Sequence, residues 1–96
     1  MRITVTAFDR SDRFIADAKA APVEVLDALE EALNRLLQNS QAGSLRLHTL
    51  PGYPKPTIFK IDVTANHAWQ LTFELDGAMA VLLRLGTHKV LNRSPR

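Results

Sequence analysis

The chain has 96 residues, of which 46% are hydrophobic and 23% charged, and its formal net charge is +2. This length suits one domain spanning residues 1–96, and this balance excludes an intrinsically disordered chain. Because cysteine is absent, a disulfide framework, a thiol nucleophile and a cysteine-based zinc site are excluded. The sequence has no signal-peptide pattern and no apolar run long enough to span a bilayer, so we expect a cytoplasmic protein without membrane contact.

The two halves of the chain differ in charge. Residues 1–42 contain five basic and seven acidic residues, a balance of −2, whereas residues 43–96 contain seven and three, a balance of +4. The basic half is a candidate surface for a polyanion. A chance fluctuation in a small protein is an equally good interpretation.

The N-terminal half is predicted to form a short strand and two helices. Apolar residues alternate with threonines over residues 3–7, which indicates a strand, and Ser11 is a candidate cap of a short helix. Pro22 suits the first turn of a longer helix, which ends near Gly43. Its apolar stripe at three- and four-residue spacing consists of Leu26, Leu29, Leu33, Leu36 and Leu37.

The C-terminal half changes to the two-residue period of strands. Leu45 and Leu47 alternate with polar residues, and a proline-rich loop follows over residues 51–56. Further strands are predicted over 58–63, 69–75 and 79–85, with Asp76 and Gly77 as a hairpin turn. Short connections predict antiparallel neighbours. The expected fold is therefore α+β, with N-terminal helices packed on an antiparallel sheet of about four strands and a loose tail at 92–96.

Three histidines are the main candidates for chemistry. His48, His67 and His88 are not spaced as metal ligands, so we expect no metal and no cofactor. His67 follows Asn66 in a predicted turn and is interpreted as a polar turn residue. Imidazoles titrate near neutrality, which suits general acid–base catalysis.

His48 and His88 each follow a predicted strand in the basic half. With cations to stabilise charge on phosphorus, two imidazoles suffice for metal-free RNA cleavage through the ribose 2′-hydroxyl. The nearby cations are Arg46 and Lys60 for His48, and Arg84 and Lys89 for His88. These cations also fit a solvated outer sheet face, and spacing alone leaves both interpretations open.

Two segments resemble the RelE/ParE toxin superfamily. They are His48–Gly52 in the middle and Leu82–His88 at the end, and the similarity extends over residues 22–93. The resemblance implies helices followed by an antiparallel sheet. It also implies a toxin of a type II toxin–antitoxin module, in the branch of mRNA interferases that cleave mRNA on the ribosome and so inhibit translation.

The resemblance also implies roles for particular residues. His88 would be the main acid or base and His48 a second catalytic histidine. Arg84, two residues before Gly86, is a candidate phosphate clamp, and the candidate substrate-binding cations are Lys60, Arg46, Lys89 and Arg93. The branch carries another histidine and an aspartate at positions held here by Thr64 and Ala68. The implied partners are a cognate antitoxin, mRNA and the ribosome.

The alternative is a non-catalytic interaction protein on the same fold. It would be a ParE-like inhibitor of DNA gyrase or an inactive toxin homologue. The N-terminal helices would then carry binding, and the histidines would be incidental.

Overall fold

The computed structural model describes residues 2–96 and contains strands and helices in a mixed order. The elements are β1 (Ala7–Arg10), α1 (Asp12–Ala20), α2 (Val23–Gln38), a 3-10 turn (Gly43–Leu45), β2 (His48–Leu50), β3 (Ile58–Asp62), β4 (Trp69–Asp76), β5 (Met79–Thr87) and α3 (His88–Arg93). The α+β class is confirmed. Within residues 2–96, no helix is both long enough and apolar enough to span a membrane.

One sheet contains all five strands in the order β1-β5-β4-β3-β2. The pairs from β2 to β5 are antiparallel, as predicted, but β1 adds a fifth strand that runs parallel to β5. Backbone bonds extend this pairing at both ends, from Thr6 N to Ala78 O at 2.8 Å and from Ser11 N to Leu82 O at 3.0 Å. The N-terminal strand thus pairs with residues far along the chain, on the outer edge of β5.

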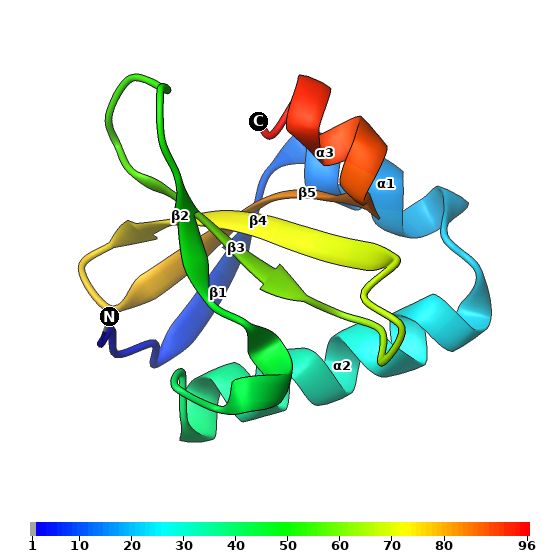
Figure 1. Cartoon of the computed structure of the whole chain (residues 1–96), viewed down its shortest axis with the longest axis horizontal. Coiled ribbons are helices and arrows are strands. Elements are labelled where there is room, and N and C mark those ends of the chain that lie inside the picture. The colour runs from blue at the N-terminus through cyan, green and yellow to red at the C-terminus, as the bar shows by residue number, and fades with distance from the viewer. Residues whose placement is uncertain (1) are drawn as a thin grey trace.

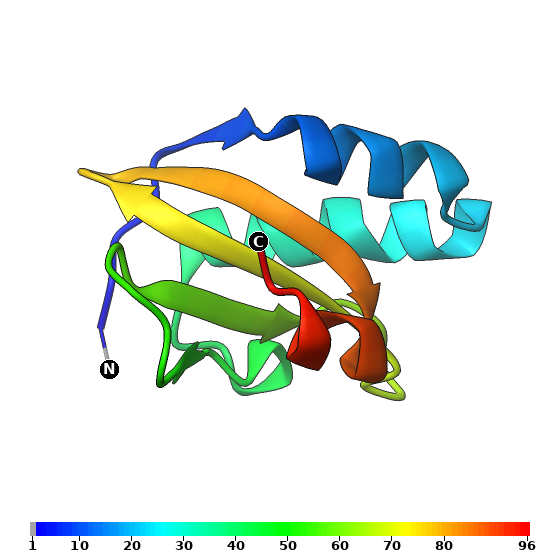
Figure 2. The same ribbon diagram turned by 90° about the horizontal axis from the view of Figure 1, so that it is seen from above.

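Helix α2 covers one face of the sheet, and α3 lies on the other with the C-terminus (Figures 1 and 2). The buried stripe of α2 is Val25, Leu29, Ala32 and Leu36, whose spacing follows the helical period. This stripe is offset from the predicted leucines, because Leu37 is 42% exposed. It packs on apolar residues that alternate along the strands, chiefly Ile61, Leu71, Phe73, Leu82 and Leu85.

A β-bulge in β5 determines which side chains face away from α2. Phe73 pairs with Leu82, whereas Thr72 pairs with Arg84, so Leu83 is an extra residue. Side chains alternate between the two faces of a strand, and an inserted residue reverses that alternation. With regular pairing, Leu83 would lie opposite Thr72 and Arg84 would lie opposite Leu71 in the core. The bulge therefore moves Arg84 to the polar face and leaves Leu85 in the core.

The β4–β5 hairpin turn lies one residue later than predicted. Asp76 pairs with Met79, so Gly77 and Ala78 are the two turn residues. Gly77 has a φ of +61°. Glycine adopts this left-handed conformation without the steric cost that a Cβ imposes.

Two further segments differ from expectation. The strand predicted around Leu45 and Leu47 is a 3-10 turn that buries Leu45 completely, and β2 begins only at His48. The expected loose tail is instead packed: residues 88–93 are helical and Pro95 is buried. The Pro95 carbonyl accepts a hydrogen bond from Thr72 Oγ1 at 2.7 Å. Satisfied polar groups and a buried proline anchor this end of the chain.

Candidate functional site

A row of polar residues crosses the sheet on the face away from α2. His48 pairs with Lys60, Lys60 with Thr72, and Thr72 with Arg84. Directly paired residues on neighbouring strands point to the same face, with Cβ atoms about 5 Å apart. Antiparallel register thus brings together three of the predicted site residues, His48, Lys60 and Arg84. Thr72, at the centre of the row, was not predicted.

Asp62 is paired with Gln70 on the same face of the sheet and makes three side-chain contacts. It is 2% exposed. Its carboxylate accepts a hydrogen bond from Arg46 Nε, contacts His67 Nδ1 at 2.6 Å, and accepts from Gln70 Nε2 at 3.0 Å. Burial acts to raise the pKa of Asp62, but the hydrogen bonds from Arg46 and Gln70 and the charges of Arg46 and His67 hold that pKa below its usual value.

Local backbone geometry brings Arg46 and His67 to this carboxylate. Both have a positive φ, +46° for Arg46 and +61° for His67, and both follow irregular turns. This conformation is uncommon for residues with a side chain. Arg46 was predicted to contact substrate, and here it pairs with Asp62. The interpretation of His67 as only a polar turn residue overlooked its contact with Asp62.

His88 is the first residue of α3 and joins the site through two amide side chains. Its Nδ1 lies 3.2 Å from Gln70 Oε1, and its Nε2 lies 2.9 Å from Asn92 Nδ2. Lys60 Nζ lies 3.5 Å from Asn92 Oδ1. Gln70 and Asn92 are therefore site residues that the sequence interpretation missed. Gln70 was recognisable from the sequence, because it is a polar residue of an alternating strand and pairs with Asp62 on the neighbouring strand.

Lys60 carries a charge in a position that is almost fully buried. It is 2% exposed. Burial lowers the pKa of the Lys60 ammonium, Asp62 acts to raise it, and Arg46 lowers it further, so the net shift is downward. An ammonium held in this way is desolvated and points across the polar face.

His48 begins β2 rather than ending a strand. Its Nδ1 lies 2.7 Å from the Arg46 carbonyl oxygen. Because a carbonyl only accepts, Nδ1 carries a proton and donates it to this bond. The Nε2 atom of His48 is then free for a substrate.

Arg84 is engaged by two other elements. Its Nε and NH2 donate to Asp17 of α1 at 2.7 Å and 3.1 Å, and its NH1 donates to the Ser94 carbonyl at 3.0 Å. The hydrogen bond to Asp17 raises the pKa of Arg84, burial opposes this, and the charge of Asp17 adds to it. Arg84 thus braces α1 and the C-terminal tail against β5. A phosphate would have to compete with both contacts.

The two remaining predicted cations project from α3. Lys89 and Arg93 are both exposed. Both add positive charge to the helix that begins at His88. Within residues 2–96, no three His, Asp or Glu side chains form a group able to hold a metal ion.

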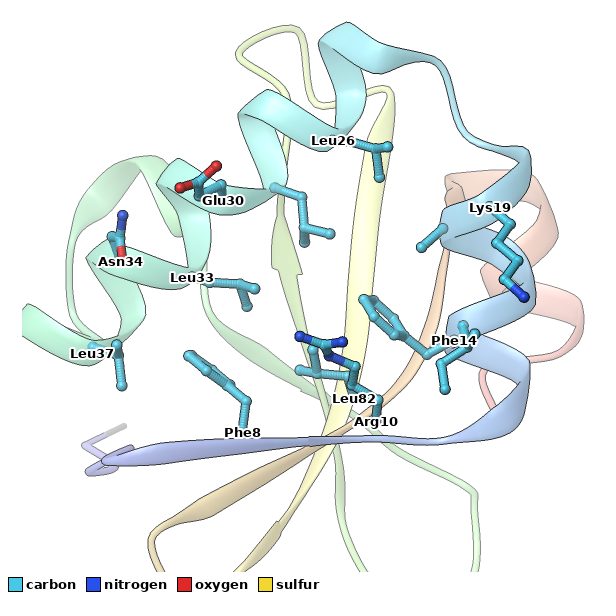
Figure 3. Close-up of a pocket in the computed structure, with 13 residues that line it drawn as sticks. Phe8, Arg10, Phe14, Lys19, Leu26, Glu30, Leu33, Asn34, Leu37 and Leu82 are labelled. Carbon is cyan, nitrogen blue, oxygen red and sulfur yellow. The ribbon is translucent and has the colours of Figure 1, made fainter.

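A separate apolar groove lies between β1, α1 and α2 and measures about 660 Å³. Figure 3 shows Phe8 from β1, Phe14 from α1 and Leu33 from α2 pointing into it. Its lining also includes the cations Arg10 and Lys19. Its lining comes from β1, α1 and α2 except for Leu82 of β5, whereas the three histidines lie in β2, α3 and the β3–β4 turn. The molecule therefore offers two distinct surfaces.

Three solved structures have the same arrangement of strands and helices. A chain of the Escherichia coli DinJ–YafQ toxin–antitoxin complex superimposes with a TM-score of 0.71 and 22% identity, covering 91% of this chain and 98% of that one. The chain has the RelE/YafQ toxin fold. YafQ from E. coli strain BL21(DE3) superimposes with a TM-score of 0.69 and 22% identity, covering 88% of this chain and 94% of that one. A chain of the RelB–RelE antitoxin–toxin complex from Methanococcus jannaschii superimposes with a TM-score of 0.67 and 17% identity, covering 88% of this chain and 95% of that one.

The fold implied by the resemblance to RelE-type toxins is therefore confirmed. No protein-family model matches the sequence, and a search of curated proteins finds no match. At identities this low, shared packing of the sheet and helices persists where most side chains differ. Fold alone does not fix an activity, so the site residues must carry the functional argument.

Proposed function

We propose that this chain is the toxin of a type II toxin–antitoxin module and that it is a metal-independent endoribonuclease of mRNA. One observation carries the proposal. His48 lies in register with the buried Lys60, and Lys60 is linked through Asn92 to His88. Two imidazoles and a desolvated cation on one face are the groups that 2′-hydroxyl attack requires.

The reaction begins when His88, as a neutral base, takes the proton of a ribose 2′-hydroxyl. The 2′-oxygen bonds to the adjacent phosphorus, and the bond from phosphorus to the 5′-oxygen breaks. His48, as imidazolium, gives a proton to the departing 5′-oxygen. The products are a 2′,3′-cyclic phosphate and a 5′-hydroxyl, and DNA is not a substrate because it lacks the 2′-hydroxyl.

The cations divide into inner and outer groups. Lys60 stabilises negative charge on the phosphoryl oxygens, since its ammonium is already desolvated. Arg46, Lys89 and Arg93 attract the backbone of mRNA from more exposed positions. Arg84 clamps phosphate only if the substrate displaces the Ser94 carbonyl, and it otherwise positions Thr72 and β5. Cleavage takes place in the cytoplasm on mRNA held by the ribosome, which halts translation.

The partner that restrains the toxin is a cognate antitoxin. We propose that its amphipathic helix occupies the groove between β1, α1 and α2, where Phe8 and Leu33 present apolar surface. Two cations, Arg10 and Lys19, and one carboxylate, Glu30, line the same groove, so its net charge is positive and acidic residues beside the apolar stripe of that helix complement it.

The nuclease proposal is tested by inducing the wild type and His88→Ala in cells and mapping RNA ends. Wild type is expected to arrest growth and to leave 5′-hydroxyl ends, and His88→Ala to lose both by about 100-fold or more. The exposed substitution Gln38→Ala at the end of α2 is the control and should behave as wild type. Equal RNA cleavage by wild type and His88→Ala would contradict the proposal.

One observation favours a non-catalytic second function. The tail covers the row, because Thr72 bonds to the Pro95 carbonyl and Arg84 to the Ser94 carbonyl. A ParE-like toxin that inhibits DNA gyrase, or an inactive homologue, does not need this row open. Equal arrest by wild type and His88→Ala, with intact transcripts and damaged DNA, identifies the gyrase function. No arrest by either identifies an inactive homologue.

A further inference from the structure

A continuous chain of hydrogen bonds runs from Lys60 to Asp62 and passes through His88. Lys60 Nζ approaches Asn92 Oδ1 at 3.5 Å, and Asn92 Nδ2 lies 2.9 Å from His88 Nε2. On the other side of the ring, His88 Nδ1 lies 3.2 Å from Gln70 Oε1. Gln70 Nε2 then lies 3.0 Å from Asp62 Oδ1. The imidazole is therefore held between two amides, each of which is bonded to a charged group.

The charged ends fix the orientation of both amides. An ammonium only donates hydrogen bonds, so Lys60 selects the oxygen of the Asn92 amide, and the NH2 group must face His88. A carboxylate only accepts, so Asp62 selects the NH2 group of Gln70, and the oxygen must face His88. Turning either amide over would oppose two donors or two acceptors.

These orientations leave His88 one neutral form. Its Nε2 faces a donor and must offer a lone pair, whereas its Nδ1 faces an acceptor and must carry the proton. We propose that Gln70 and Asn92 are positioning residues that hold His88 as the Nδ1–H tautomer, with Nε2 as its basic atom. The structural part of this inference stands alone, and its consequence for cleavage rests on the proposed nuclease function.

The two positioning residues act at different times. Gln70 is 3% exposed and lies within β4, so it retains the Nδ1 proton throughout the reaction. Asn92 is exposed on α3. Its Nδ2 gives Nε2 the hydrogen bond that a ribose 2′-hydroxyl would give, so the substrate displaces Asn92 and takes its place. The lone pair on His88 Nε2 therefore accepts from Asn92 in the free protein and faces the ribose 2′-hydroxyl in the RNA complex.

The direct test is a nitrogen NMR spectrum of the full chain with labelled histidine, near neutral pH. Wild-type His88 is expected to show a protonated Nδ1 and a bare Nε2. Gln70→Met, which keeps the length of the side chain but removes its oxygen, should shift His88 toward the Nε2–H form. Gln38→Met, an exposed site at the end of α2, is the matched control and should leave the spectrum unchanged.

A second variant keeps the test decisive even if Gln70→Met does not fold. Asn92→Asp replaces the donor facing Nε2 by an acceptor at an exposed position, so a proton signal should appear on Nε2. The inference is overturned if wild-type His88 carries its proton on Nε2. It is also overturned if neither Asn92→Asp nor a folded Gln70→Met alters the tautomer.

Cleavage kinetics link this inference to the proposed function. Gln70→Met should lower kcat about 10-fold to 100-fold with KM unchanged, because the base is mispositioned while the RNA-binding cations remain. If wild type shows the expected tautomer but no cleavage, the nuclease proposal fails and the positioning network stands. Cleavage by a protein with the opposite tautomer would reject the network alone.

Discussion

At the scale of single residues, Asp62 organises the polar face. Its carboxylate gathers Arg46 from the turn before β2, His67 from the β3–β4 turn and Gln70 from β4. A buried carboxylate is costly unless its oxygens are paired. With three partners Asp62 is satisfied, and it ties two irregular turns to the sheet.

The depressed pKa of Asp62 predicts a dependence of stability on acid. A carboxyl group whose folded-state pKa lies below its unfolded value near 4 contributes stability above that value, and loses it as the pH falls through the folded pKa. The unfolding free energy of wild type should therefore fall below about pH 4. Asp62→Asn should cost about 1–3 kcal/mol at pH 7 and show a flatter acid limb in urea titrations.

Asp27, exposed on α2, provides the charge-matched control for Asp62. Asp27→Asn should keep the wild-type acid limb and change stability by less than about 0.5 kcal/mol. Parallel acid limbs for wild type and Asp62→Asn would show that another carboxyl group governs this range.

The buried cation Lys60 lowers the free energy of unfolding, because folding desolvates its ammonium. Its lowered pKa means that the charged ammonium is less favourable in the folded protein than in the unfolded one. Lys60→Met should therefore raise the unfolding free energy by about 1 kcal/mol, and the midpoint of thermal unfolding by about 4–8 °C. The same substitution should lower kcat for RNA cleavage by about 100-fold. Lys55→Met, in the exposed loop, is the control for both, and a lower midpoint for Lys60→Met than for wild type would contradict the argument.

The sequence contained part of this site. His48, Lys60 and Arg84 were recognisable because each is a polar residue in or beside an alternating apolar segment. The contacts of Arg46 and His67 with Asp62 were not recognisable, since the positive φ of both residues arises from turns that no local pattern specifies. Asn92 joins the site only because residues 88–93 fold back as a helix across β4 and β5.

At the scale of elements, Asp17 and Arg84 brace α1 against β5. Asp17 accepts two hydrogen bonds from the Arg84 guanidinium and a third from Leu85 N at 3.0 Å. The side chain of Arg84 is 10% exposed and that of Asp17 18%. Ion pairs shielded to this degree are strongly destabilised when one partner is removed.

Asp17→Asn should destabilise the fold by about 2–3 kcal/mol, because the amide cannot accept from all three donors and opposes the guanidinium with its own NH2 group. Chemical unfolding measures the change. Asp12→Asn in the first turn of α1 removes the same charge at an exposed site and should cost less than about 1 kcal/mol. Equal losses in the two variants would mean that helix charge, not the pair with Arg84, stabilises this element.

Element by element, alternation predicted β3, β4 and β5, and three- and four-residue spacing predicted α2. The parallel pairing of β1 was beyond local patterns, because it joins residues more than seventy positions apart. The bulge had a faint signal in Leu82 and Leu83, two apolar residues in succession where alternation requires one. Packing of the tail depends on Thr72 and Pro95, which meet only after β4 and β5 have paired.

At the scale of the whole molecule, the two surfaces are made by different parts of the chain. The histidine-bearing face belongs to β2–β5 and α3, within the basic residues 43–96. The groove belongs mainly to β1, α1 and α2 in the acidic half. A partner in the groove contacts elements that brace β5 through Asp17. A partner bound in the groove therefore need not occlude the imidazoles directly.

Leu37 provides a test of the groove that leaves the fold intact. It lines the groove and is 42% exposed, so Leu37→Glu should change stability by less than about 0.5 kcal/mol. A carboxylate there meets the apolar face of the proposed antitoxin helix without a partner, and its desolvation should weaken the complex at least about 10-fold. The probe is an acidic amphipathic helical peptide, titrated calorimetrically. Val23→Glu, 71% exposed on the same helix but outside the groove, should bind as wild type. Equal affinity of both variants would place the antitoxin elsewhere.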